Sequence, residues 1–256
     1  LWVLINTIVK FIKGPVVIYF VLEYLDAMQQ GVWYSFLSLG ALSVFAEMGF
    51  TRIISVFIGH EFSRIVKKNG FLYGEKYHVN KVVSLVKYST NLYIGIIFLA
   101  LIILSIVGWV FFKNNTIEVY YAWLGFAFAT GIQLIITLFQ AMYIGSGEVS
   151  EGYKNIFFGT VAGSIAMIFS LYNGYSLWSL AIGSLFSSLI VFIQIYIKNR
   201  KIIIQIYKNW FCCDYSWGKE IIPIQAKYSL SFVTGYFAFQ MYVPMIYQID
   251  GAIIAG

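Results

Sequence analysis

Long apolar runs with almost no charge dominate the pattern of hydrophobic and polar positions along the chain. These runs are apolar on every side, and most are close to the roughly 20 residues that a helix needs to cross a bilayer. One run is about twice that length, and a turn signal at Asn173-Gly174 divides it into two helices. The pattern therefore predicts seven membrane-spanning helices, at residues 1–25, 30–58, 87–112, 119–144, 155–173, 177–197 and 221–248.

Composition supports the same fold class, an all-α integral membrane protein built as a polytopic helical bundle. Of the 256 residues, 60% are apolar and 11% are charged, which excludes a disordered chain and disfavours an ordinary soluble domain. A transmembrane β-barrel would need segments of about ten residues that alternate apolar and polar positions, and these runs do not alternate. The first run carries Lys10, Lys13 and Gly14-Pro15 near its middle, which indicates a kinkable span and not a cleaved signal peptide.

The distribution of Lys and Arg between the spans predicts the orientation of the chain. Connections on one side carry twelve of these residues, and the opposite connections carry only Lys113. Because basic loops stay in the cytoplasm, we expect a multi-pass protein of the cytoplasmic membrane with its N-terminus inside. The basic segment 61–84 is expected to lie on the inner leaflet. This topology accounts for the net charge of +6, so no nucleic-acid partner is expected.

Few residues carry chemistry suited to catalysis or metal binding. Cys212 and Cys213 are adjacent and lack further ligands nearby, so free thiols are expected. His60 and His78 do not show the spacing with Cys or carboxylates that indicates a metal site. No phosphate-binding loop motif occurs in the sequence. We therefore expect a protein that is not an enzyme, with no catalytic residue, no metal and no cofactor.

Five ionisable residues lie inside the predicted spans and carry most of the functional information. They are Lys10, Lys13, Glu47, Arg52 and Lys227. Each costs at least about 2.5 kcal/mol at the bilayer centre, so each is expected to face a partner or a water-filled cavity. At a rise of about 1.5 Å per residue, the first three share one level slightly below mid-membrane, and the last two lie at the cytoplasmic mouth.

These levels predict a cationic cavity with two tiers. Four cations against one carboxylate favour an anionic guest such as a phosphate or pyrophosphate, with the lysines as point charges and Arg52 as a bidentate clamp. Two structural alternatives stay open. In one, Lys10 and Glu47 form a buried ion pair that only orders the first two helices, and in the other, Arg52 and Lys227 extend to the lipid headgroups. Two lysines beside one acid leave one lysine unpaired, which favours the cavity.

Two segments carry a resemblance to a known family of membrane transporters. In the region from Tyr24 to Arg52 the matching features are Tyr24-Leu25, Gly31 with Trp33, and the acidic-x-Gly-hydrophobic turn at residues 47–50. The second segment, residues 235–244, looks like the seventh helix of the same family. The chain thus resembles the Wzx-like polysaccharide (O-antigen repeat-unit) flippases of the multidrug/oligosaccharidyl-lipid/polysaccharide exporter superfamily.

The resemblance implies a fold of two six-helix bundles. Residues 1–200 would form the first bundle, 201–220 a cytoplasmic connection, and 221–256 the truncated first helix of the second bundle. Since the chain also lacks an initiator Met, we expect a fragment of a longer protein.

The function that the resemblance implies is that of a flippase working by alternating access. Its substrate would be a polyprenyl-pyrophosphate-linked oligosaccharide, the repeat unit of a polysaccharide such as O-antigen in lipopolysaccharide. Lys10, Lys13 and Arg52 would take the headgroup role. The implied partners are this lipid-linked oligosaccharide, membrane lipids and other membrane proteins of polysaccharide assembly.

Two other functions remain open at this point. A cation-coupled multidrug exporter of the same superfamily would be expected to favour carboxylates in its cavity, and here one acid faces four bases. A membrane-embedded polysaccharide polymerase or glycosyltransferase would usually need a large extramembrane loop with acids or His at an interface. The predicted outer loops are short, which argues against such an enzyme.

Overall fold

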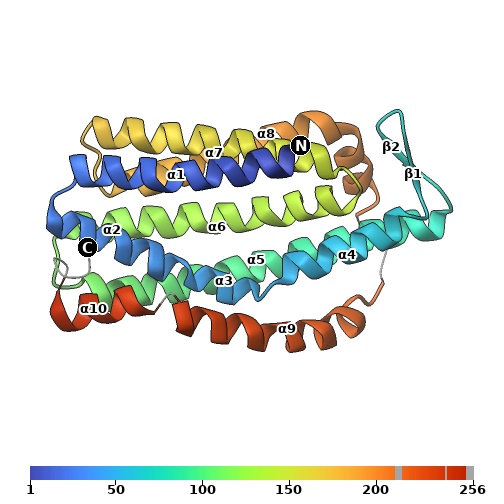
Figure 1. Cartoon of the computed structure of the whole chain (residues 1–256). Coiled ribbons are helices and arrows are strands. Elements are labelled where there is room, and N and C mark those ends of the chain that lie inside the picture. Colours follow the sequence, from blue (N-terminus) through green and yellow to red (C-terminus); the bar gives the residue numbers. More distant parts are fainter. Residues whose placement is uncertain (211–214, 240, 252–256) are drawn as a thin grey trace.

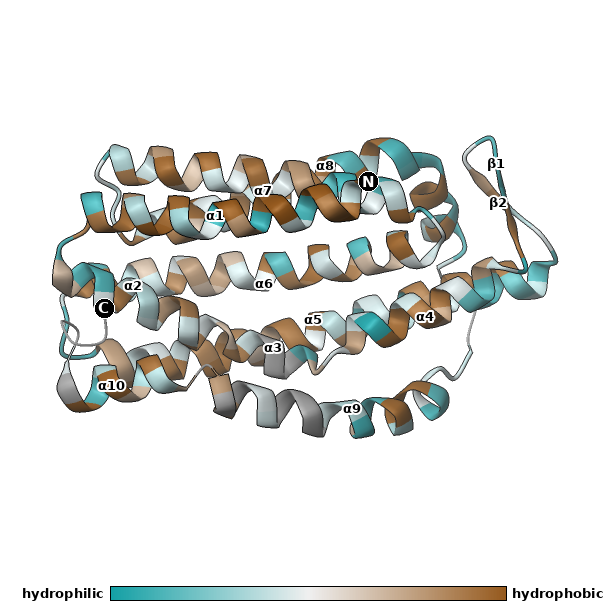
Figure 2. Ribbon diagram, viewed as in Figure 1, coloured by the Kyte–Doolittle hydropathy of each residue, from teal (hydrophilic) through white to brown (hydrophobic). Residues whose placement is uncertain are grey.

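The computed structural model describes residues 1–210, 215–239 and 241–251, which form roughly parallel helices and one small hairpin (Figure 1). Five helices are long and apolar enough to cross a membrane: α1 (Trp2–Tyr24), α5 (Lys76–Phe112), α6 (Ile117–Gly145), α7 (Val149–Tyr172) and α8 (Trp178–Lys208). Hydrophobic residues line these helices along their length (Figure 2). The fold is that of a multi-pass, all-α membrane protein.

The second predicted span is broken, so the prediction of one continuous helix there is wrong. The segment consists of α2 (Ala27–Gly40), α3 (Leu42–Glu47) and α4 (Phe50–Phe62). Between α3 and α4, Met48 and Gly49 adopt left-handed φ angles of 47° and 75°. Because a left-handed glycine commonly ends a helix without changing hydropathy, the apolar pattern does not reveal this break.

The last predicted span is also divided, into α9 (Gly218–Phe239) and α10 (Tyr242–Asp250). Helix α9 packs against α3 and α4, and α10 packs against α2. The Gln225 amide nitrogen on α9 donates to the carbonyl oxygen of Met48 at 2.8 Å. Helix ends leave carbonyl groups without partners, so Gln225 satisfies one of the groups freed by the break between α3 and α4.

Two predicted connections contain more regular structure than expected. Within residues 61–84, strands β1 (Val66–Lys68) and β2 (Phe71–Tyr73) form an antiparallel hairpin. Its turn is Asn69-Gly70 with φ angles of 54° and 81°, as a type I′ turn requires. Helix α5 then begins at Lys76, and α8 continues to Lys208 across non-helical angles at Asn199, into the connection predicted for residues 201–220.

Helix α6 lies at the centre of the bundle and packs against α4, α5, α7 and α8. Close packing of α7 on α8 depends on small residues. A Cβ atom on Gly163 would lie 2.7 Å from the Gly183 carbonyl oxygen, so a larger side chain at this position does not fit. Glycines that allow such close backbone approach are typical of membrane helix interfaces.

The end of the bundle that carries the hairpin is called the basic end here, because Lys76, Lys198 and Lys201 lie on its elements (Figure 1). A buried ion pair joins α4 to α5 at this end, with 3.4 Å between the Lys81 ammonium and the Glu61 carboxylate. The same ammonium lies 4.3 Å from the ring centroid of Tyr215. The segment that leads into α9 is therefore held to α5 by a cation–π contact.

Candidate functional site

A cavity of about 750 Å³ opens among the spanning helices and collects three of the residues predicted from the sequence. Lys10 and Lys13 reach it from α1, and Glu47 reaches it from the end of α3. Helices α2, α6, α7 and α8 supply the remaining walls. The common level predicted for these three side chains thus corresponds to a shared cavity, while their role in binding a substrate stays a prediction.

The two lysines enter the cavity without a carboxylate partner among the described residues. They are three positions apart on α1, so they lie on the same helix face and are close enough to repel each other. Among the residues that the structure describes, the Lys side chains that pair with Glu are Lys67, Lys81 and Lys198. The positive charge of Lys10 and Lys13 is therefore not neutralised by an ion pair within the described part of the chain.

Glu47 lines the same cavity, but its carboxylate forms hydrogen bonds across the break between α3 and α4. Its carboxylate accepts hydrogen bonds from the Thr51 backbone N–H, at 3.3 Å, and from the Thr51 hydroxyl. The buried Lys10–Glu47 ion pair considered as a structural alternative does not occur among the described ion pairs. Glu47 thus acts here as an acceptor for the first turn of α4, which begins directly after the left-handed Gly49.

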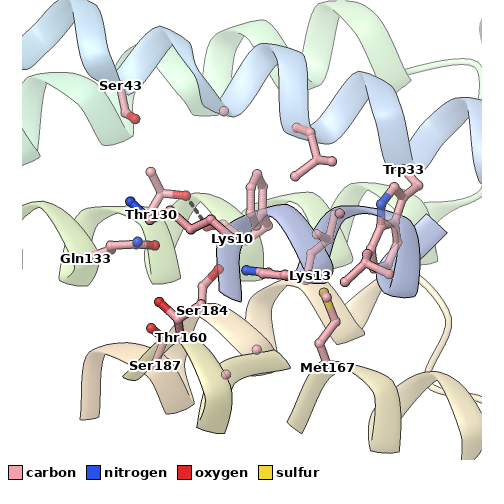
Figure 3. Close-up of a pocket in the computed structure, with 18 of the residues that line it drawn as sticks. Lys10, Lys13, Trp33, Ser43, Thr130, Gln133, Thr160, Met167, Ser184 and Ser187 are labelled. Carbon is pink, nitrogen blue, oxygen red and sulfur yellow. Dashed lines mark hydrogen bonds between the residues drawn. The ribbon is translucent and has the colours of Figure 1, made fainter. Parts of the chain in front are cut away.

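The cavity is polar at one end and apolar at the other. Trp33, Phe126 and Met167 lie at the end next to the α1–α2 turn. The labelled lysines and uncharged polar side chains lie toward the other end (Figure 3), and Glu47 and apolar residues such as Leu134 complete the lining. The uncharged polar lining residues are Ser43, Thr130, Gln133, Thr137, Thr160, Ser184 and Ser187. Such a cavity can hold an amphiphile, with charge and hydroxyl groups toward one end and hydrocarbon toward the other.

Arg52 and Lys227 do not line this cavity in the described structure. Both side chains are exposed, Arg52 on α4 and Lys227 on α9. The expected second tier of cations is therefore not part of the cavity. The height estimate for Arg52 assumed a continuous helix through Met48 and Gly49, where the structure instead has the left-handed break between α3 and α4.

The ionisable groups alone do not predict the uncharged polar lining of the cavity. A signal for it exists in α6, where Thr130, Gln133 and Thr137 recur at spacings of three and four. That spacing places them on one helix face. Ser184 and Ser187 follow the same rule on α8, so a stripe of polar residues in an otherwise apolar helix predicts a cavity wall.

The structure bears on metal binding by the described residues but not on the state of the two cysteines. The described residues contain no group of three His, Cys, Asp or Glu side chains that could hold a metal ion. His78 instead lies with its Nδ1 atom 3.5 Å from the Glu61 carboxylate at the basic end. Cys212 and Cys213 lie outside the described residues.

Comparison with known proteins leaves the family open. No family model matches this chain, and neither the curated proteins nor the solved structures contain a match. The cavity itself is the feature that bears on function, because Lys10 and Lys13 have no ion-pair partner among the described residues and its lining divides into polar and apolar parts.

Proposed function

We propose that this chain forms part of a flippase that moves a polyprenyl-pyrophosphate-linked oligosaccharide across the cytoplasmic membrane by alternating access. The observation that carries the proposal is the pair of lysines, Lys10 and Lys13, facing a cavity of about 750 Å³ without a described ion-pair partner. No covalent step is part of the proposal, because the protein only changes the leaflet in which its substrate lies.

The charge of the cavity favours an anionic guest. A cation inside a membrane protein is costly unless it meets water or an anion, and here two cations face one carboxylate. Glu47 accepts two hydrogen bonds from Thr51 and forms no ion pair with Lys10 or Lys13, and one carboxylate balances only one of the two cations. A pyrophosphate between Lys10 and Lys13 would supply the missing negative charge.

The division of the cavity suits a lipid-linked sugar. Hydroxyl and amide side chains such as Thr130, Gln133 and Ser187 can exchange hydrogen bonds with sugar hydroxyls. The apolar end formed by Trp33 and Met167 can contact the hydrocarbon next to the phosphate. A cation exporter would need the opposite balance of charge, so the cavity favours the flippase over a multidrug exporter.

The test is complementation in the native host after deletion of the gene. The complete gene product that contains this chain is expected to restore surface glycan and to clear lipid-linked repeat units from the inner leaflet. The Lys10→Gln/Lys13→Gln variant is expected to lose both effects at equal membrane abundance. Lys113→Gln is the matched control, because Lys113 follows the end of α5 and does not line the cavity.

The possible results distinguish an error in the proposed flippase function from an error in the proposed substrate-binding lysines. Full rescue by the lysine double variant would remove the lysines from the substrate site while leaving the flippase in place. Surface glycan that is unaffected by deletion of the gene would overturn the flippase itself. Export of organic cations lost on deletion would then make the multidrug exporter the leading function.

A further inference from the structure

A second hollow lies at the basic end of the bundle and shares no lining residue with the central cavity. It is a groove of about 360 Å³ between α5 and α8, with α6 packed against both helices. Its inner part is lined by hydrocarbon and aromatic side chains, including Val86, Ile136, Phe139 and Phe192. The groove is thus suited to an apolar guest.

The length of the groove matches one leaflet of a membrane. Along α6 its lining extends from Ile136 to Ser146, the residue just after the helix ends. At about 1.5 Å per residue this is roughly 15 Å, and the hydrocarbon core of one leaflet is about half of 30 Å. Along α6 the groove therefore extends from the basic end about a third of the way into the helix, a depth comparable to that of one acyl chain.

Polar groups are concentrated at the mouth of the groove. Lys67 lies there, and its ammonium is 2.9 Å from the Glu148 carboxylate and 3.2 Å from the Asn199 side-chain oxygen. Tyr207 and Trp210 line the same end, where aromatic residues are typical of the membrane–water boundary. Thr90 is the polar residue at the far end. This polarity is that of a lipid, with one polar end and one apolar end.

The charge around the mouth is positive. The two nearby acids are already paired, Glu148 with Lys67 and Glu151 with Lys198. Neither Arg200 nor Lys208 lines the groove, but each directly follows a lining residue of α8, is exposed, and forms no ion pair with a described residue. An anionic headgroup at the mouth would meet these unpaired cations, whereas a zwitterionic headgroup carries its own positive charge.

We propose that this groove binds one acyl chain of an anionic phospholipid, with the phosphate at the mouth near Lys67, Arg200 and Lys208. The lipid closes the gap between α5 and α8 on the side where α6 supports both. The site is separate from the cavity of the proposed flippase and does not depend on that function. Its occupant is a membrane lipid that stays bound and not a substrate that is moved.

The test measures lipid retention by the purified chain. After extensive washing in a neutral detergent, native mass spectrometry is expected to show one retained lipid when phosphatidylglycerol is supplied. Phosphatidylcholine with the same acyl chains is expected to be retained about tenfold less, since it lacks the net negative charge. Equal retention of the two lipids would overturn the proposal of an anionic ligand.

Two neighbouring isoleucines on α8 provide a matched pair of variants. Ile203 lines the groove and Ile204 does not, although both side chains are exposed. Ile203→Trp is expected to fill the groove and weaken phosphatidylglycerol binding about tenfold or more, and Ile204→Trp is expected to leave it unchanged. Circular dichroism of both variants without lipid checks that they fold. Equal binding by the two variants would overturn the groove as the site.

The remaining rival occupant is the polyprenyl tail of a transport substrate. Polyprenyl phosphate is therefore added in competition with bound phosphatidylglycerol, using the wild-type chain. The proposal expects no displacement at equal concentrations. Complete displacement would assign the groove to the substrate, and this result is distinguishable from failure of the flippase, which is measured through surface glycan.

Discussion

The central cavity and the groove at the basic end differ in the charge and polarity of their lining residues, and therefore in the kind of ligand that each can bind. The central cavity carries Lys10 and Lys13 without described carboxylate partners, together with a stripe of hydroxyl and amide groups. The groove at the basic end is apolar along most of its length, and the lysine at its mouth, Lys67, already pairs with Glu148. Unpaired charge inside a bundle favours a charged guest, whereas an apolar interior with charge only at and near its mouth favours a hydrocarbon chain that ends in a charged headgroup.

The walls differ in construction as well. One wall of the central cavity is the α7–α8 pair, packed tightly through Gly163 and Gly183. The opposite wall is formed by α2 and α3, and α3 ends at the break that Gln225 of α9 contacts. A cavity between a tightly packed wall and a broken one can change shape at the broken side. The groove has continuous α5 and α6 for two of its walls, which suits a lipid that stays bound.

The largest effect is expected from reversing the charge of the central cavity. Lys10→Glu/Lys13→Glu places three carboxylates in the cavity and should lower substrate translocation roughly 100-fold or more, because an anionic guest then meets repulsion. Translocation in reconstituted vesicles measures this. Retention of phosphatidylglycerol should not change, because neither lysine lines the groove. Loss of both properties would show that the two sites are coupled and would break the comparison.

The tightly packed wall can be tested at Gly163. A side chain there would place its Cβ 2.7 Å from the Gly183 carbonyl oxygen, so Gly163→Leu should lower the free energy of unfolding by about 1–3 kcal/mol. Gly95→Ala on α5 is the control, because a Cβ at Gly95 meets nothing within 4 Å. Thermal unfolding in detergent measures both variants. Equal stability of the two would mean that α7 and α8 separate more easily than the packing implies.

The broken wall can be tested at Gln225. Gln225→Ala removes the donor to the Met48 carbonyl and should cost about 1 kcal/mol of local stability. Hydrogen exchange at the start of α4 should therefore accelerate, while exchange in α7 and α8 should not. Acceleration spread evenly over the bundle would contradict a local role for this contact.

The smallest effect is expected from acid at the basic end. Burial by itself raises the pKa of the Glu61 carboxyl, but the Lys81 ammonium with its hydrogen bond and the nearby rings of His60 and His78 outweigh it and hold the pKa below its ordinary value. The contribution of this carboxylate to stability is thus complete above the unfolded pKa of about 4.3. It is lost as the pH falls through the folded-state pKa.

Unfolding of wild type and Glu61→Gln across the acid range measures this contribution. The wild type should lose stability on acidification by more than the variant does, because the variant has no carboxylate to protonate. Parallel curves for the two proteins would remove Glu61 as the source of the acid dependence.

Much of the helical framework follows from hydropathy, and the exceptions have local causes. Spans at α1, α5, α6, α7 and α8 were predictable because an apolar run of sufficient length has few other stable structures in a membrane. The break at Met48-Gly49 was not, since it depends on backbone angles that leave hydropathy unchanged. The hairpin had a usable signal, the Asn69-Gly70 turn, which the basic character of the segment concealed.

The sequence by itself determined that charge lies inside the spans and that Lys10, Lys13 and Glu47 share a level, because helical rise and the cost of charge in lipid can be applied residue by residue. Only the tertiary structure decided that Glu47 accepts hydrogen bonds from Thr51 and that Arg52 does not line the cavity. It also revealed the groove, whose lining has the same apolar residue types as a lipid-facing surface. Pairing, helix direction and grooves depend on how separate helices pack, and that information lies in the contacts between them.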